Sequence, residues 1–219
     1  MKFSLFSKIL FEVPEPIALI ESYCFQNDYY KNYDLLLLEG KRKVEDANKI
    51  GARIEKKKVL PECKTVTEGA KDLRIFQYGL DSFLELDDKT RSAYIDELDE
   101  KVIAKLLQIK TIGLSKATKI LHTLYPKVIP ILDDNLQREY KGINSQWTEE
   151  HSNQILIAYY KNLREGDNLE NLTYISETIS GNNLVALTKV GIFDILWWSY
   201  LKAKKLGQEK EINWSTIKW

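Results

Sequence analysis

The residues best suited to chemistry lie in one stretch, residues 109–140. A turn containing Gly113 joins two segments with helical spacing, and the adjacent acids Asp133 and Asp134 precede a third. Glycine accepts a positive φ and leaves the backbone accessible, and the amides that start the following helix can bind a phosphate oxygen. Aspartate is also a preferred N-cap, but two acids followed by Asn135 exceed what a cap requires. The stretch therefore predicts either an ordinary helical turn or a device that holds a nucleic-acid backbone and aims a carboxylate at it.

The composition is that of a globular chain whose charges cancel. Of 219 residues, 44% are hydrophobic and 29% are charged, and 32 basic residues balance 32 acidic ones. Overall charge therefore does not favour nucleic-acid binding, which would have to come from a local patch. The basic stretch at residues 40–58 is interpreted either as a solvated surface or as such a phosphate-contacting patch.

Cysteine, histidine and hydropathy patterns limit the other classes. Cys24 and Cys63 are too few for an iron–sulfur cluster or a four-cysteine zinc site, and we expect them to be free thiols. The two histidines stand apart from other ligand types, so neither a metal nor another cofactor is expected. No small-residue cleavage site follows the N-terminal residues, and no apolar run reaches the roughly 18 residues of a membrane span. We therefore expect a cytoplasmic protein without a membrane partner.

Helical spacing dominates the chain, whereas strict apolar–polar alternation is rare. Apolar residues recur at three- and four-residue steps in residues 14–26, 41–58, 87–109, 148–166, 168–181 and 188–207. We expect an all-α protein of about eight to ten helices, as one compact unit or two lobes. In the two-lobed version, residues 70–140 form the lobe with the turn, and residues 1–69 with 141–219 form the other.

The stretch around the turn resembles the helix-hairpin-helix DNA glycosylase superfamily. In that family an L-P-G-h-G-x-x-x-A hairpin, in which h is apolar, is followed after one helix by V-D-T-H-V-x-R. IKTIGLSKATKIL and LDDNLQR match these motifs without gaps, with Asp133 on the catalytic Asp and Arg138 on the Arg. Lys110 and Thr111 replace the Pro and the first Gly of the hairpin. Ser115 stands where lyase-active members have Lys, as in the branch that removes adenine.

The resemblance implies a monofunctional DNA glycosylase that flips a base out of duplex DNA and uses no cofactor. Asp133 would stabilise the oxocarbenium-like sugar, or orient a water, as the N-glycosidic bond breaks. The residues expected to contact DNA are Thr111, Gly113, Ser115, Lys116 and Arg138. Asp134 is left as the expected helix cap.

Several residues are candidates for the pocket of the flipped base. Tyr125, Trp197 and Trp198 could stack on it, although tryptophans at helical spacing are more often core residues. Asp194 lies within the apolar segment GIFDILWW, where a buried carboxylate must be paired or protonated. We assign Asp194 either to structural pairing or to the site.

Two alternatives remain open at the level of the sequence. A non-catalytic helix-hairpin-helix module could bind DNA or a protein, which the altered hairpin and the neutral net charge favour. An all-α accessory or defence-associated protein could use its acids only as helix caps. ANKIGARI at residues 47–54 and DILWW at residues 194–198 also resemble signatures of a set of bacterial proteins without an assigned activity, which supports the fold more than the function.

Overall fold

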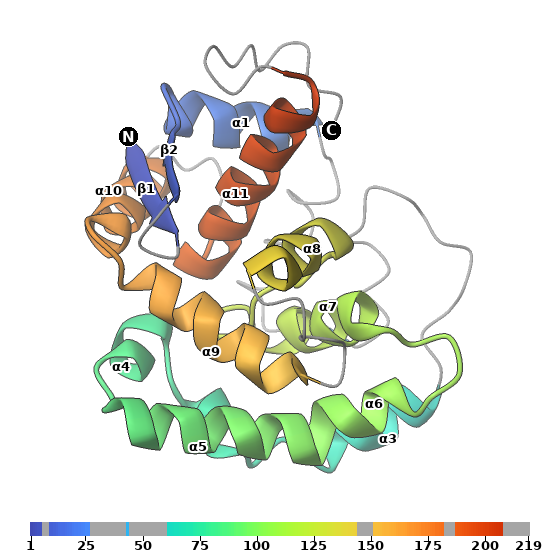
Figure 1. Cartoon of the computed structure of the whole chain (residues 1–219). Helices are drawn as coiled ribbons and strands as arrows, with labels where there is room; N and C mark the ends of the chain where they lie inside the picture. The colour runs from blue at the N-terminus through green and yellow to red at the C-terminus, as the bar shows by residue number, and fades with distance from the viewer. Residues whose placement is uncertain (6–8, 27–42, 44–60, 144–150, 182–186, 208–219) are drawn as a thin grey trace. The chain divides into compact units, whose positions relative to one another are not determined.

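The computed structural model describes residues 1–5, 9–26, 43, 61–143, 151–181 and 187–207 (Figure 1). The chain divides into two compact units, one of residues 42–161 and one of Met1–Lys41 with Asn162–Trp219. Helices form nearly all of the regular structure in the described ranges, which confirms the all-α fold class. The basic stretch and ANKIGARI, apart from Lys43, lie outside the described residues, as does the C-terminal tail from residue 208.

The unit built from both chain ends contains a short β-hairpin that the sequence patterns did not predict. Strands β1 (Lys2–Leu5) and β2 (Ile9–Glu12) pair antiparallel, with Phe3 opposite Phe11. The rings of Phe3 and Phe11 stack with centroids 5.4 Å apart, and Phe11 packs on Tyr200 at 4.8 Å. Each strand spans only four residues, so its alternation is too short to compete with the helical periodicity of the rest of the chain.

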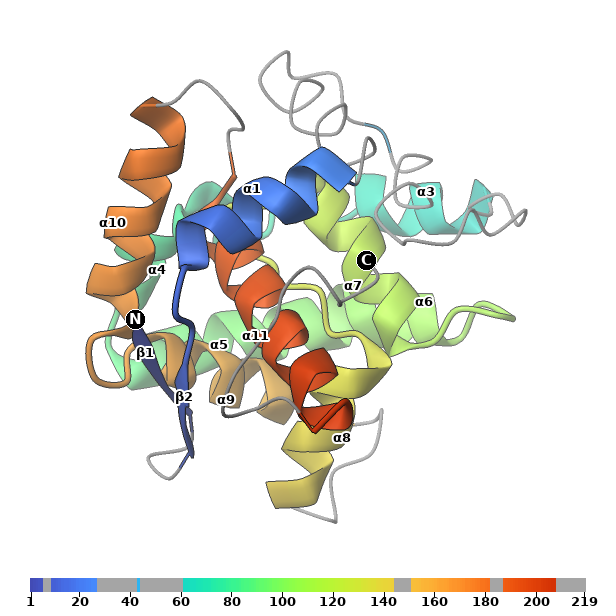
Figure 2. The ribbon, with the colours of Figure 1, turned by 90° about the horizontal axis from the view of Figure 1, so that it is seen from above.

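Three helices complete this unit and contact one another: α1 (Pro16–Gln26), α10 (Asn168–Gly181) and α11 (Lys189–Lys205). Figures 1 and 2 both show α1 beside α11. The Thr188 hydroxyl caps α11 by accepting the Gly191 amide at 3.1 Å, and Gly207 follows the helix with φ +69°. The helix expected within residues 188–207 is therefore confirmed, including its C-terminal glycine.

A side chain at the start of α10 holds the β-hairpin. Asn168 Oδ1 accepts the Ser4 amide at 2.8 Å, and Asn168 Nδ2 donates to the Ser4 carbonyl at 2.7 Å. Asn168 is fully buried, so these bonds satisfy polar groups that water does not reach. The hairpin edge is thereby fixed to the helix.

The unit of residues 42–161 is built along one long rod (Figure 1). The rod consists of α5 (Asp88–Leu98), the π-helical segment η3 (Asp99–Ile103) and α6 (Ala104–Leu107). Asp87 caps it by accepting the Thr90 amide at 2.9 Å, at the start of the range 87–109 in which helical spacing was expected. Buried Arg91 donates to the carbonyls of Leu84 and Leu86 and closes the preceding loop.

The remaining elements of this unit are α3 (Pro61–Glu68), η2 (Arg74–Gln77), α4 (Leu80–Leu84), α7 (Leu114–Leu124), α8 (Asp134–Ile143) and α9 (Ser152–Leu163). Ser152 Oγ donates to the carboxylate of Asp99, and Asn153 Nδ2 donates to Asp96 at 2.8 Å. These bonds dock the first turn of α9 on the rod. In the ranges that the structure covers, no helix has the length and apolar character needed to cross a membrane.

Candidate functional site

The turn between α6 and α7 places its unusual backbone angle at Thr111. Thr111 has φ +76° and is the one non-glycine residue with a positive φ among those described. Gly113 instead has φ −96° and ψ 175°, an extended conformation open to any residue, so the turn does not use the positive φ that glycine allows. Thr111 matches the first hairpin glycine of the glycosylase family. A left-handed conformation costs an L-residue roughly 1–2 kcal/mol, and a β-branched residue adopts it rarely, so the turn is strained.

The start of α7 presents backbone N–H groups without acceptors. Gly113 caps α7 through its carbonyl, which accepts the amides of Lys116 and Ala117 at 3.0 and 2.9 Å. No residue in the described part of the chain accepts a hydrogen bond from the amides of Gly113, Leu114 or Ser115. Because the helix dipole is positive at this end, these groups form a potential anion-binding site.

An acid-free stretch surrounds this turn, and the motif patterns did not single it out. Residues 101–132 contain six lysines and neither Asp nor Glu, within a chain of zero net charge. Lys101 pairs with Glu97 at 2.6 Å, whereas the other five make no ion pair with a described residue: Lys105, Lys110, Lys116, Lys119 and Lys127. The hairpin is therefore a local basic patch. Counting charges in a sliding window along the sequence would have found it.

The residue directly before Asp133 is fixed by both of its backbone groups. The Leu132 amide donates to Thr118 Oγ1 at 3.1 Å, and the Leu132 carbonyl accepts from Gln137 Nε2 at 2.7 Å. Thr118 and Gln137 are both buried, so water does not compete for these bonds. Thr118 lies on α7 and Gln137 on α8, so the two helices together determine where Asp133 lies.

The earlier part of the same connection is held in the same way. The Tyr160 hydroxyl donates to the Val128 carbonyl at 2.5 Å, and His122 Nδ1 lies 2.6 Å from the Ile129 carbonyl. A carbonyl can only accept, so Nδ1 carries the proton in this bond. His122 is 2% exposed, which makes it a structural residue of the connection.

Asp133 is the N-cap of α8. Its Oδ1 accepts the amides of Asn135 and Leu136, both at 2.9 Å. The prediction that Asp134 caps the helix is therefore wrong: Asp134 is the exposed first residue of α8. The second oxygen of Asp133, Oδ2, receives no hydrogen bond from any described residue. One oxygen thus performs the structural task, and the other remains available to a ligand.

Arg138, the other residue of the second motif, folds back along its own helix. Its Nε donates to the Asp134 carbonyl at 3.0 Å, and its Nη2 donates to Asn135 Oδ1 at 2.8 Å. The side chain is exposed. The guanidinium is thereby tethered to the two residues that directly follow Asp133.

Tyr125 lies directly after α7 and already has an aromatic partner. Its ring stacks on Phe76 with centroids 3.6 Å apart and an interplanar angle of 2°. Burial raises the pKa of Tyr125, and the negative charge of Asp72 adds to this rise. Phe76 therefore covers one face of the only pocket candidate that lies in the same unit as Asp133.

The other three pocket candidates belong to α11, in the unit built from both chain ends. Trp197 is 1% exposed and packs on Phe193 at 5.6 Å, so in this structure it is a core residue that a base does not reach. Asp194 is also buried and is not without a partner. Half-buried Trp198 has Lys202 Nζ 4.0 Å from its ring centroid, and burial lowers the pKa of this lysine.

No relative supplies a function for this arrangement. No family model, curated protein or solved structure matches the chain. The described residues also contain no group of three or more His, Cys, Asp or Glu side chains that could hold a metal ion. The resemblance to glycosylases therefore rests on the motif residues between Ile109 and Arg138.

Proposed function

We propose that the hairpin of α6 and α7 binds the sugar-phosphate backbone of DNA. The observation that supports this function best is the set of N–H groups at residues 113–115, which have no acceptor in the described part of the chain. They lie at a helix N-terminus within a stretch that has lysines and no acids. Backbone amides and lysines contact phosphates without reading bases, so the hairpin would bind DNA with little sequence preference.

Salt dependence of duplex binding tests this function. Each lysine that contacts a phosphate adds about 0.9 to the slope of log K against log salt, so removing one lowers that slope by about 1. We expect this loss for Lys110→Ala and Lys116→Ala. Lys89→Ala is the matched control, because Lys89 is an exposed lysine of the same unit outside the acid-free stretch. No binding at low salt would reject DNA as the partner, and equal slopes for all variants would reject the hairpin as the DNA-binding site.

Base excision is the second candidate function, and the unpartnered Oδ2 of Asp133 favours it. In this hypothesis Oδ2 faces the sugar and stabilises the positive charge that develops as the N-glycosidic bond breaks. The base departs with the electron pair of that bond, water adds to the anomeric carbon, and the proton that this water loses is taken up by the base. Ser115 at the position of the lyase lysine agrees with hydrolysis that leaves an abasic site and an intact strand.

A substitution at Asp133 can separate this chemistry from the helix cap. Asparagine is as good an N-cap as aspartate but has no negative charge, so Asp133→Asn should fold like the parent protein. Both proteins are incubated with duplexes that carry damaged, methylated or hypermodified bases, and abasic sites are measured. We expect product with the parent protein and none with Asp133→Asn. Equal product from both, or none across the panel while DNA binding persists, would reject base excision and leave backbone binding as the function.

A further inference from the structure

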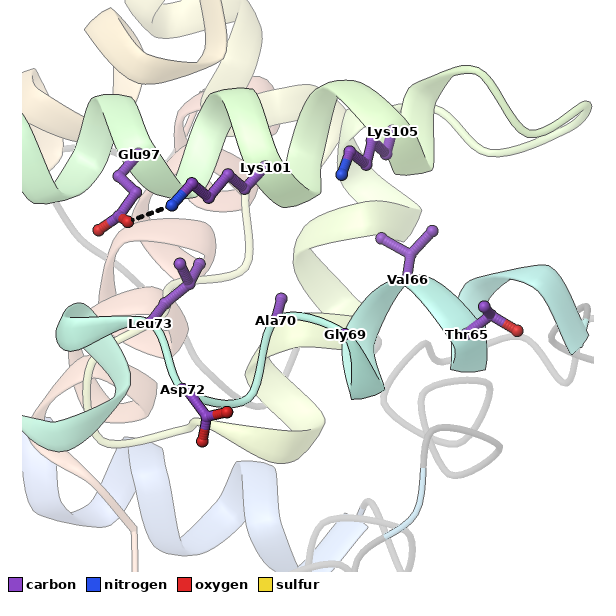
Figure 3. Close-up of a pocket in the computed structure, with 9 residues that line it drawn as sticks. All are labelled: Thr65, Val66, Gly69, Ala70, Asp72, Leu73, Glu97, Lys101 and Lys105. Carbon is purple, nitrogen blue, oxygen red and sulfur yellow. Dashed lines mark hydrogen bonds and ion pairs between the residues drawn. The ribbon is translucent and has the colours of Figure 1, made fainter.

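A cavity lies beside the rod, within the unit of residues 42–161. Its volume is about 580 Å³, within the range of roughly 300–1,000 Å³ that is typical of small-molecule sites. One wall is α3 with the turn that follows it, and the other is the rod (Figure 3). Val66, Ala70 and Leu73 supply apolar surface on the first wall. None of the motif residues of the hairpin lines this cavity.

The π-helical segment aligns three charged residues on the second wall. Glu97, Lys101 and Lys105 are spaced four residues apart and all line the cavity. In a regular α-helix of 3.6 residues per turn, Glu97 and Lys105 would point about 80° apart. The wider turn of η3 (Asp99–Ile103) lies between them and offsets this drift. Such π-bulges within α-helices are frequent at functional sites.

Among the described residues, one lysine of the cavity has no counterion. Lys101 donates to Glu97 at 2.6 Å, so these two largely neutralise each other. Lys105 makes no hydrogen bond or ion pair with a residue that the structure describes. In Figure 3 the carboxylate of Asp72 points away from both lysines, whereas Lys105 extends toward the apolar wall. An anion placed at Lys105 would therefore find an unpaired positive charge beside apolar surface.

We propose that this cavity binds a small organic anion, with its carboxylate or phosphate at Lys105 and its apolar body against Val66, Ala70 and Leu73. The inference does not depend on DNA binding or on catalysis by Asp133. The cavity combines a charged group, which would fix the orientation of a ligand, with apolar surface, which would supply contact area. This is the usual composition of a small-molecule site.

Amide chemical shifts of the full chain test the proposal with four probes: phenyl phosphate, benzoate, benzyl alcohol and inorganic phosphate. We expect one or both aromatic anions to shift the amides of Gly69, Ala70 and Lys105 at millimolar concentration. Comparison of phenyl phosphate with benzoate identifies the preferred head group. The neutral alcohol and inorganic phosphate should bind about tenfold more weakly, since each lacks one of the two interactions. Binding of neither aromatic anion, or equal binding of all four probes, overturns the proposal.

Substitutions then locate the site. Lys105→Ala removes an exposed side chain and should weaken binding of the aromatic anion about tenfold, the effect of losing one charged hydrogen bond. Val66→Phe should weaken it as well, because the larger ring narrows the cavity. Lys89→Ala is again the control and should bind like the parent protein. Unchanged affinity in Lys105→Ala would overturn the proposal whatever the result at Val66.

Discussion

Replacing Thr111 with glycine should stabilise the protein, although glycine substitutions in turns usually destabilise. Thr111 is exposed, has φ +76° and makes no hydrogen bond or ion pair with another described residue. The substitution therefore removes no contact that the structure records. It acts only on the conformational preferences of the folded and unfolded chain.

Two opposing terms set the size of the effect. A left-handed conformation costs an L-residue roughly 1–2 kcal/mol, and glycine is free of this cost. Glycine gives the unfolded chain more conformational freedom, which removes about 0.4–1 kcal/mol of stability. The midpoints of these two ranges leave a gain of about 0.8 kcal/mol in the free energy of unfolding. For a chain of this length such a gain raises the midpoint of thermal unfolding by about 1–4 °C.

Urea denaturation of the full chain measures the change against two controls. Gln108→Gly lies in the same turn at φ −72°, so it relieves no strain and should lose about 0.4–1 kcal/mol. Thr111→Asn should gain stability, because asparagine tolerates the left-handed region without the entropy of glycine. If Thr111→Gly destabilises the protein as much as Gln108→Gly does, the strain at Thr111 does not exist and this reasoning fails.

Three further predictions concern the positioning of Asp133 and the start of α9. Asp133→Ala should lower the free energy of unfolding by about 1 kcal/mol in urea denaturation, whereas Asp133→Asn, which still caps α8, should lose much less. Burial raises the pKa of Asp99 above its unfolded value, so Asp99 stabilises the fold most below the unfolded pKa and loses this contribution as pH rises through the folded pKa. Asp99→Asn should therefore be more stable than the parent protein at neutral pH, and the difference should shrink when urea midpoints are measured below about pH 4. Thr118→Val leaves the Leu132 amide without its acceptor and should cost about 1–3 kcal/mol, with faster hydrogen exchange at that amide and recovery in Thr118→Ser.

Helix positions could be predicted from the sequence because they depend on local periodicity and capping. The ranges around α1, α5, α10 and α11 followed from apolar spacing. Asp87 at the start of α5 and Gly207 after the end of α11 are residue types that commonly mark helix ends. The β-hairpin was missed because four-residue strands carry little periodic signal. The π-helical segment was missed as well, since its residues, DEKVI, carry no pattern that separates it from the α-helices on either side.

The candidate residues were selected by motif spacing, but the structural role of each one could not be predicted from that spacing. Motif spacing singled out Asp133 as the candidate carboxylate. Which of the two adjacent acids caps α8 depends on the exact residue at which the helix begins, and sequence patterns do not locate a helix start to within one residue. The two hydrogen bonds that hold the backbone of Leu132, here called the clamp on Leu132, come from Thr118 and Gln137. These residues are 19 positions apart, and no local sequence pattern relates them. Trp197 and Trp198 are neighbours in sequence, but the helix directs only Trp197 fully into the core.

Capping and catalysis at Asp133 are compatible because a carboxylate has two oxygens. A side chain that must stabilise a developing positive charge needs a fixed orientation, and free rotation would waste part of that stabilisation. The two amide bonds to Oδ1 fix the side chain, and the buried clamp on Leu132 fixes the backbone from which it projects. Oδ2 is then held in place without forming a hydrogen bond to a described residue of the protein. The cap that makes Asp133 look merely structural is thus the arrangement that a catalytic carboxylate would require. Only the charge, which Asp133→Asn removes while the cap remains, distinguishes the two roles.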